Sequence, residues 1–223
     1  MLNPDVIGDQ HWDTRQHDVV PFTVGRVDAD NGFVHVIDDA SLAALMTARD
    51  TVTDFVAYLT KKEEFIDRGR LAAAAGEEEL LAYFVTHVDE HGEHGFVFAD
   101  EADKIFLLEG FWADLETHPQ RRAQIEANRI SYAWDALIEK FNLHLLNGTQ
   151  YFANYATVSE GELARRFLAR EPRTKRRLLA QMLADLFDTT PQSKLAVRRL
   201  LPLQWEDPLY VFVMVPRFDG VSD

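Results

Sequence analysis

The strongest constraint on the fold is a long helical pattern that begins at Pro119 and ends at Asn147-Gly148. Proline suits the first turn of a helix, because the backbone N–H that it lacks has no partner there in any case. Large apolar side chains then recur every three or four residues, which aligns them along one face of the helix; they are Ile130, Trp134, Leu137, Phe141 and Leu145. The pattern predicts one long helix near residues 119–146 whose apolar stripe must be covered by other parts of the chain.

Short β-rich runs bounded by turn residues lie on both sides of the helical segments. Residues 19–24 and 33–37 predict an N-terminal hairpin, because a polar loop with a glycine separates them. Two further pairs of extended segments are predicted at 96–98 with 105–108, and at 195–201 with 209–215.

Several helix starts are marked by residues that satisfy the free backbone N–H groups of a first turn. Capping-box spacing occurs in Thr51-Val-Thr-Asp54 and in Ser159-Glu-Gly-Glu162. Strands and helices therefore alternate in blocks rather than as regular βα units. The order predicts the α+β class, with short antiparallel strands and hairpins packed with several helices.

Length and composition limit the organisation of the chain. Its 223 residues, 47% of them hydrophobic, suit one large domain or two small ones. We expect a polar N-terminal segment over residues 1–20 and a single α+β domain over 21–223, with two lobes dividing near 118–120. The absence of cysteine excludes thiol nucleophiles, zinc–thiolate sites and disulfides. It also fits a cytoplasmic location, as does the lack of a signal-like or membrane-spanning run.

The net charge of −14 is unevenly distributed. Residues 1–120 carry 25 Asp and Glu against 8 Lys and Arg, whereas residues 121–223 carry 12 against 15. The acidic first part should repel nucleic acid and anionic lipid. Contact with a polyanion would therefore use the second part of the chain.

A dense group of cations lies in that second part, around Pro172. Guanidinium groups bind phosphate oxygens in a bidentate manner. The residues predicted to bind an anion are Arg166, Arg170, Arg173, Arg176 and Arg177. This group predicts a phosphate-bearing or acidic macromolecular partner. The alternative is that the same arginines pair with the acidic first half of the chain, or that they lie solvated on the surfaces of two helices.

A second constellation combines His87, His91 and His94 with interleaved acids, which are ligand types for zinc, manganese or iron. Gly92 and Gly95 predict a polar turn here instead of a continuing helix. We therefore expect neither a tight metal site nor a cofactor.

A third group is His35 with Asp38 and Asp39, at the end of a predicted strand. A histidine beside carboxylates can perform acid–base chemistry. The competing interpretation is that His35 is a hydrogen-bonded strand residue and that one of the aspartates caps the following helix.

The chain contains none of the glycine-containing signatures of α/β-hydrolases, P-loop enzymes or dinucleotide-binding enzymes. Several segments resemble an uncharacterised family of bacterial proteins over residues 20–215, including Gly32-Phe-Val-His-Val-Ile-Asp38, Glu109-Gly-Phe-Trp112 and Asp207-Pro-Leu-Tyr-Val-Phe212. The resemblance implies an association with nucleases for some members and no established activity. No lysine of this chain has an acid two residues before it, so a PD-(D/E)xK centre would lie elsewhere or be degenerate.

Three functions follow as hypotheses. The first is a non-catalytic cytoplasmic binding or accessory module that contacts an anionic partner through the arginine-rich helices. The second is a metal-dependent, nuclease-like hydrolase that uses one of the histidine groups. The third is a structural or oligomeric role, which would be favoured by exposed apolar patches.

Overall fold

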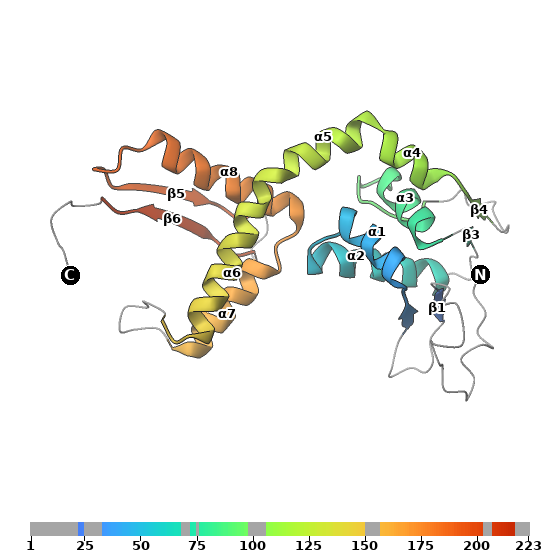
Figure 1. Cartoon of the computed structure of the whole chain (residues 1–223), viewed down its shortest axis with the longest axis horizontal. Helices are drawn as coiled ribbons and strands as arrows, with labels where there is room; N and C mark the ends of the chain where they lie inside the picture. The colour runs from blue at the N-terminus through green and yellow to red at the C-terminus, as the bar shows by residue number, and fades with distance from the viewer. Residues whose placement is uncertain are drawn as a thin grey trace. The chain divides into compact units, whose positions relative to one another are not determined.

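The computed structural model describes residues 22–24, 33–67, 72–74, 76–97, 106–149, 157–202 and 207–216 (Figure 1). The predicted polar segment over residues 1–20 lies outside these ranges. The chain divides into two compact units, Met1–Ala123 and Gln124–Asp223. Helices dominate both units and short paired strands accompany them, which confirms the predicted α+β class.

The first unit contains most of the short elements. They are β1 (Phe22–Val24), β2 (Val34–Val36), α1 (Asp39–Ala48), α2 (Val52–Asp67), β3 (Ala72–Ala74), α3 (Glu77–Thr86), β4 (Phe106–Leu108), α4 (Phe111–Thr117) and the start of α5 (Pro119–Asn128). The predicted cap of α2 is present, because Thr51 Oγ1 accepts from the backbone N–H of Asp54 at 3.1 Å.

Strand pairing in the first unit differs in part from the prediction. β1 and β2 form the expected antiparallel hairpin. β4 pairs in parallel with β3, whereas Phe96 and Val97 belong to no strand among the described residues; Phe98 of the predicted pair lies outside them. Alanine has low β propensity, so Ala72–Ala74 carries no strand signal of its own.

The core of the first unit joins α1, α2 and α3. Leu45, Tyr58, Leu81 and Phe84 are fully or almost fully buried and form one cluster. Tyr58 and Phe84 meet edge to face, with 5.2 Å between ring centroids. This arrangement is favourable for aromatic pairs beyond the area that they bury.

The second unit contains longer elements. They are the rest of α5, a 3-10 turn η2 (Arg129–Ser131), α6 (Tyr132–Leu146), α7 (Val158–Ala169), α8 (Arg173–Thr189), β5 (Ala196–Leu200) and β6 (Tyr210–Met214). The predicted long helix is therefore present as α5, η2 and α6 in succession. The two C-terminal extended segments form an antiparallel hairpin.

The core of the second unit forms where α6 and α8 meet the hairpin. Trp134 is 1% exposed and contacts Tyr210 and Phe212 of β6 edge to face. Its indole N–H donates to the carbonyl of Leu168 at 3.2 Å. The predicted apolar stripe thus contributes Trp134 to the core, and Ile130 and Leu137 pack beside it.

Candidate functional site

The arginine-rich segment spans the junction between α7 and α8. Thr157 begins α7 with a complete capping box to Glu160, two residues before the box expected at Ser159. Pro172 is the N-cap of α8 and has an extended backbone. The predicted anion-binding residues therefore lie at the end of one helix and over the first turns of the next.

Arg173 and Arg176 do not face solvent. Both side chains are 9% exposed, and their guanidinium groups converge on Asp135 of α6. Arg173 Nη1 lies 2.7 Å from one carboxylate oxygen and Arg176 Nη1 lies 2.5 Å from the other. One carboxylate thus binds two cations. We call this arrangement of Asp135 with Arg173 and Arg176 the Asp135 fork. Burial of a charge is tolerated only with such pairing.

Arg176 has a second structural role. Its Nε donates to the carbonyl of Glu171 at 2.7 Å, and its Nη2 donates to the carbonyl of Ala169. Carbonyls at the end of a helix lack intrahelical partners, and a cation there also suits the helix dipole. In the structure Arg173 and Arg176 thus bind an internal carboxylate, and Arg176 also binds carbonyls at the end of α7 and just after it; an external anion on these two residues stays a prediction.

Glu171 organises a further buried polar group. Its carboxylate accepts from the hydroxyl of Tyr210 at 2.7 Å and lies 3.1 Å from Lys175 Nζ. Lys175 also lies 3.6 Å from Asp207. Burial raises the pKa of Tyr210 well above its usual value, and the hydrogen bond to Glu171 raises it further. The group ties α8 to β6 and keeps Tyr210 a hydrogen-bond donor.

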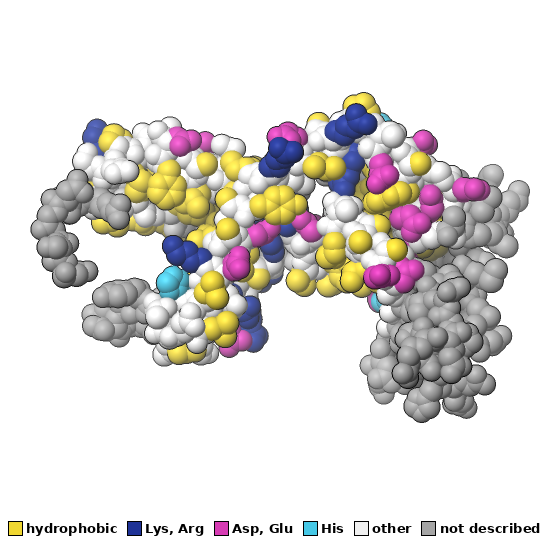
Figure 2. Space-filling model, in the orientation of Figure 1, with side chains coloured by type: hydrophobic (Ala, Val, Ile, Leu, Met, Phe, Trp, Pro, Cys, Tyr) yellow, Lys and Arg dark blue, Asp and Glu magenta, His cyan; other side chains and the backbone are white. Residues whose placement is uncertain are grey.

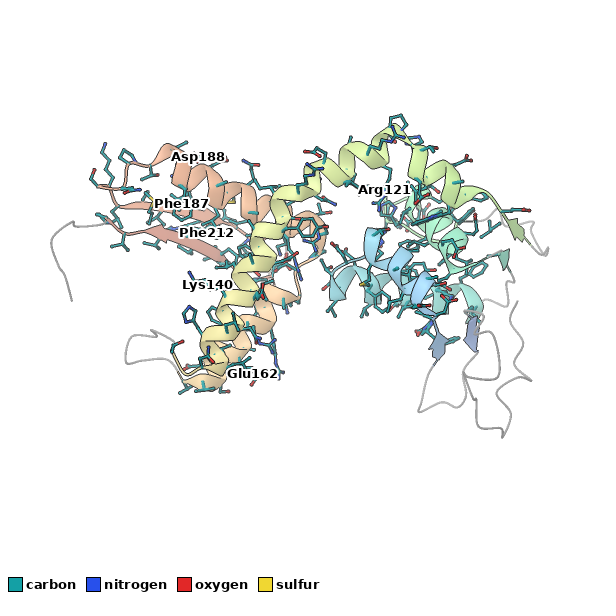
Figure 3. All side chains as sticks on the ribbon, viewed as in Figure 1. Arg121, Lys140, Glu162, Phe187, Asp188 and Phe212 are labelled. Atoms are coloured by element: carbon teal, nitrogen blue, oxygen red, sulfur yellow. The ribbon has the colours of Figure 1, made fainter. Side chains whose placement is uncertain are left out.

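The other predicted anion-binding arginines lie nearer the surface. Arg166 pairs with Glu162, which Figure 3 labels on α7, at 2.5 Å. The Arg170 guanidinium lies 4.4 Å above the ring of Phe167. Arg177 reaches the side-chain oxygen of Asn128 at 3.4 Å. Arg166 and Arg170 are the exposed members of the predicted set.

The predicted acid–base group in the first unit takes structural roles. His35 Nε2 lies 2.8 Å from Glu63 of α2, and its side chain is 12% exposed. Asp38 is the N-cap of α1 and accepts from the backbone N–H of Ser41 at 2.7 Å. Asp39 accepts from the N–H of Ala40 in the first turn.

The three later histidines follow the end of α3. His87 Nδ1 bonds the carbonyl of Tyr83, and the two rings stack with centroids 3.8 Å apart. His91 is exposed in the turn, whereas the backbone of His94 forms an isolated antiparallel β-bridge with Val88. Burial and the Arg49 guanidinium lower the pKa of His94. In the described ranges, no three histidine or acidic side chains are grouped so that they could hold a metal ion.

A buried ion pair in the first unit was not expected from the sequence. Lys62 Nζ lies 2.6 Å from Glu77, and the two side chains are 5% and 1% exposed. The hydroxyl of Tyr58 donates to the other carboxylate oxygen of Glu77 at 2.5 Å. Tyr58 and Lys62 are four residues apart and share a face of α2. That spacing is the only signal in the sequence, since Glu77 belongs to another helix.

The β5–β6 hairpin presents its two faces differently. On the face toward α8, Leu200, Tyr210 and Phe212 enter the core. On the other face Val197 pairs with Val213 and Arg199 with Val211. The apolar side chains there are between 40% and 72% exposed. We define this open face by Val197, Val211 and Val213 of the strands, by Leu195, Leu201, Leu209 and Val215, which directly flank the strand ends, and by Arg199 as its charged residue.

The sequence contains a signal for the open face. A strand that faces water on one side alternates apolar and polar residues, whereas a strand covered on both sides is apolar throughout. Residues 209–215 are apolar without interruption. Their pattern is that of a doubly covered strand, yet the described part of the chain leaves one side open.

Hydrophobic side chains also gather over α8 and the hairpin in the space-filling view (Figure 2). Phe187 of α8, labelled in Figure 3, is 62% exposed. None of the described helices has the length and hydrophobicity needed to cross a membrane.

The chain matches no protein-family model, no curated protein and no solved structure.

Proposed function

We propose that the protein is a non-catalytic binding module whose contact surface is the open face of the second unit, and that this surface takes another protein. The observation that carries the proposal is the row of exposed aliphatic side chains on a strand pair whose other face is already packed. Apolar patches of this extent on soluble proteins mark interaction sites. The structural roles of His35 and Asp38 further support binding over catalysis.

The charge of the second unit agrees with a protein partner. Residues 124–223 carry 13 Lys and Arg against 12 Asp and Glu, so this unit is almost neutral. Protein surfaces that bind nucleic acid are typically strongly basic, whereas the centres of protein–protein interfaces are depleted of charge. The open face has one charged residue, Arg199, and is otherwise aliphatic.

A single introduced thiol tests the proposal, because the natural chain has no cysteine. Val211→Cys places the thiol on the open face. We expect it to react freely with maleimide in dilute buffer and about tenfold more slowly in an extract of the source cells, where a bound protein would exclude the reagent. Protease treatment of the extract should restore the fast rate.

Leu143→Cys provides the matched control. Leu143 lies on α6 and is 51% exposed, close to the 47% of Val211. Its thiol should react equally fast in buffer and in extract. If the thiol at position 211 were protected neither in extract nor in concentrated purified protein, the proposed binding surface would be refuted.

A second candidate function retains the predicted anionic partner with a smaller surface. It is favoured by Arg166 and Arg170, which are exposed one turn apart at the end of α7. The logarithm of any affinity for DNA or heparin should fall linearly with the logarithm of the salt concentration. Arg166→Gln/Arg170→Gln should reduce that slope by about two without loss of stability.

The two buried arginines, Arg173 and Arg176, provide the contrasting control. Arg173→Gln/Arg176→Gln should destabilise the second unit, because these side chains hold Asp135. If the natural chain is retained on heparin at about 50 mM salt and Arg166→Gln/Arg170→Gln is retained equally well, the surface formed by Arg166 and Arg170 is excluded.

A further inference from the structure

We infer that the partner of the open face is a second copy of this chain, which stacks its own open face against it. This inference rests on the proposed function and names the partner of the same surface. It is argued from the area of the face, its shape and its charge.

The area matches what a stable dimer needs. Seven aliphatic side chains that are 40% to 72% exposed present on the order of 600 Å² of apolar surface. Two copies would together bury on the order of 1,200 Å², which is the lower end of the range for specific interfaces. An interface of that size without large aromatic anchors typically gives a dissociation constant in the micromolar range.

The shape of the face suits a copy of itself. Its apolar side chains are all valine or leucine, and those within the two-stranded ladder are Val197, Val211 and Val213, with Val197 opposite Val213. Two such surfaces can stack about 10 Å apart as in a β-sandwich. A two-fold axis through the face would place the same residues on both sides of the interface, as in most homodimers.

Charge does not oppose this contact. Two copies carry a strongly negative total charge, but the excess acids lie in residues 1–123, and residues 124–223 are almost neutral. Arg199 is the one charged side chain of the open face. Its long aliphatic stem can cover apolar surface while the guanidinium stays in water. The near-neutral face therefore admits an identical face.

Sedimentation velocity of the purified full chain tests the inference. Between about 0.1 and 100 μM, the weight-average mass should rise from the 25.5 kDa of one chain toward twice that value. Val211→Lys should weaken the association by at least about tenfold, because it would bury an unpaired ammonium group. Leu143→Lys on α6 should leave the association unchanged.

A second variant separates loss of association from loss of folding. Val211→Thr/Val213→Thr keeps β-branched side chains on the strand and replaces one methyl group of each by a hydroxyl group on the open face. We expect an unchanged circular dichroism spectrum and an association weakened by about tenfold or more. If this folded variant associated as tightly as the natural chain, the interface would lie elsewhere and the inference would be overturned.

The thiol at position 211 distinguishes failure of this inference from failure of the proposed function. If a second copy is the partner, purified protein at about 100 μM should protect the thiol as well as the cell extract does. A chain that remained monomeric at that concentration, with a thiol protected only in extract, would overturn the inference and leave the proposed function standing. A thiol protected in neither would end both.

Discussion

Asp135→Ala should lower the free energy of unfolding of the second unit by about 3 kcal/mol, because it leaves two buried guanidinium groups without their carboxylate. Removing one partner of a buried ion pair typically destabilises a protein by about 3–5 kcal/mol. The lower end applies because the Asp135 side chain is 30% exposed and water can partly replace it. Urea denaturation measures the change, and hydrogen exchange locates it among α6, α8 and the hairpin.

An exposed pair of the same chemistry is the control for the Asp135 fork. Glu162 and Arg166 lie 2.5 Å apart, but their side chains are 49% and 68% exposed. Glu162→Gln should therefore change stability by less than about 0.5 kcal/mol. If Asp135→Ala were equally mild, the guanidinium groups would reach other partners, and our structural assignment of Arg173 and Arg176 would be wrong.

Glu77→Gln should destabilise the first unit by about 3–5 kcal/mol, because the ammonium group of Lys62 would then be buried beside an amide instead of a carboxylate. The glutamine keeps the size of the side chain and can still accept from Tyr58 through its oxygen. The loss would therefore report the missing charge and not a cavity. Urea denaturation with hydrogen exchange over α2 and α3 measures it.

Removing the second charge tests the cause. Lys62→Met/Glu77→Gln should recover at least about half of the stability lost in the single variant, since no unpaired charge remains. Glu64→Gln is the control on the same helix, because its partner Lys61 is substantially exposed. A double variant as unstable as Glu77→Gln would show that the ion pair is not the source of the effect.

Local signals in the sequence predicted several elements correctly. The Thr51–Asp54 box begins α2, and the turn residues between β1 and β2 gave the hairpin. These features depend on residues near one another in the chain, so spacing and propensity are sufficient. The same reasoning placed the start of α7 two residues late, because Thr157 and Ser159 both have an acid three positions later.

The partners of the buried charges could not be predicted in the same way. The sequence shows a basic group near Pro172 and an acidic first part, which suggested an external anion or a partner among residues 1–120. The actual partner is Asp135, 38 residues before Arg173 and on the basic side of the charge step. Which helix faces produce such contacts depends on how α6 and α8 pack, and helical periodicity contains no information on that packing.

The Asp135 fork also limits how α8 can slide along α6. A shift of α8 by one helical turn, about 5.4 Å, would move both guanidinium groups away from the single carboxylate between them. Two cations would then be buried without a counterion, whereas the apolar contacts of Leu179 and Ala180 could re-form with neighbouring side chains. Hydrophobic packing holds the two helices together, and the fork selects the single register in which they fit.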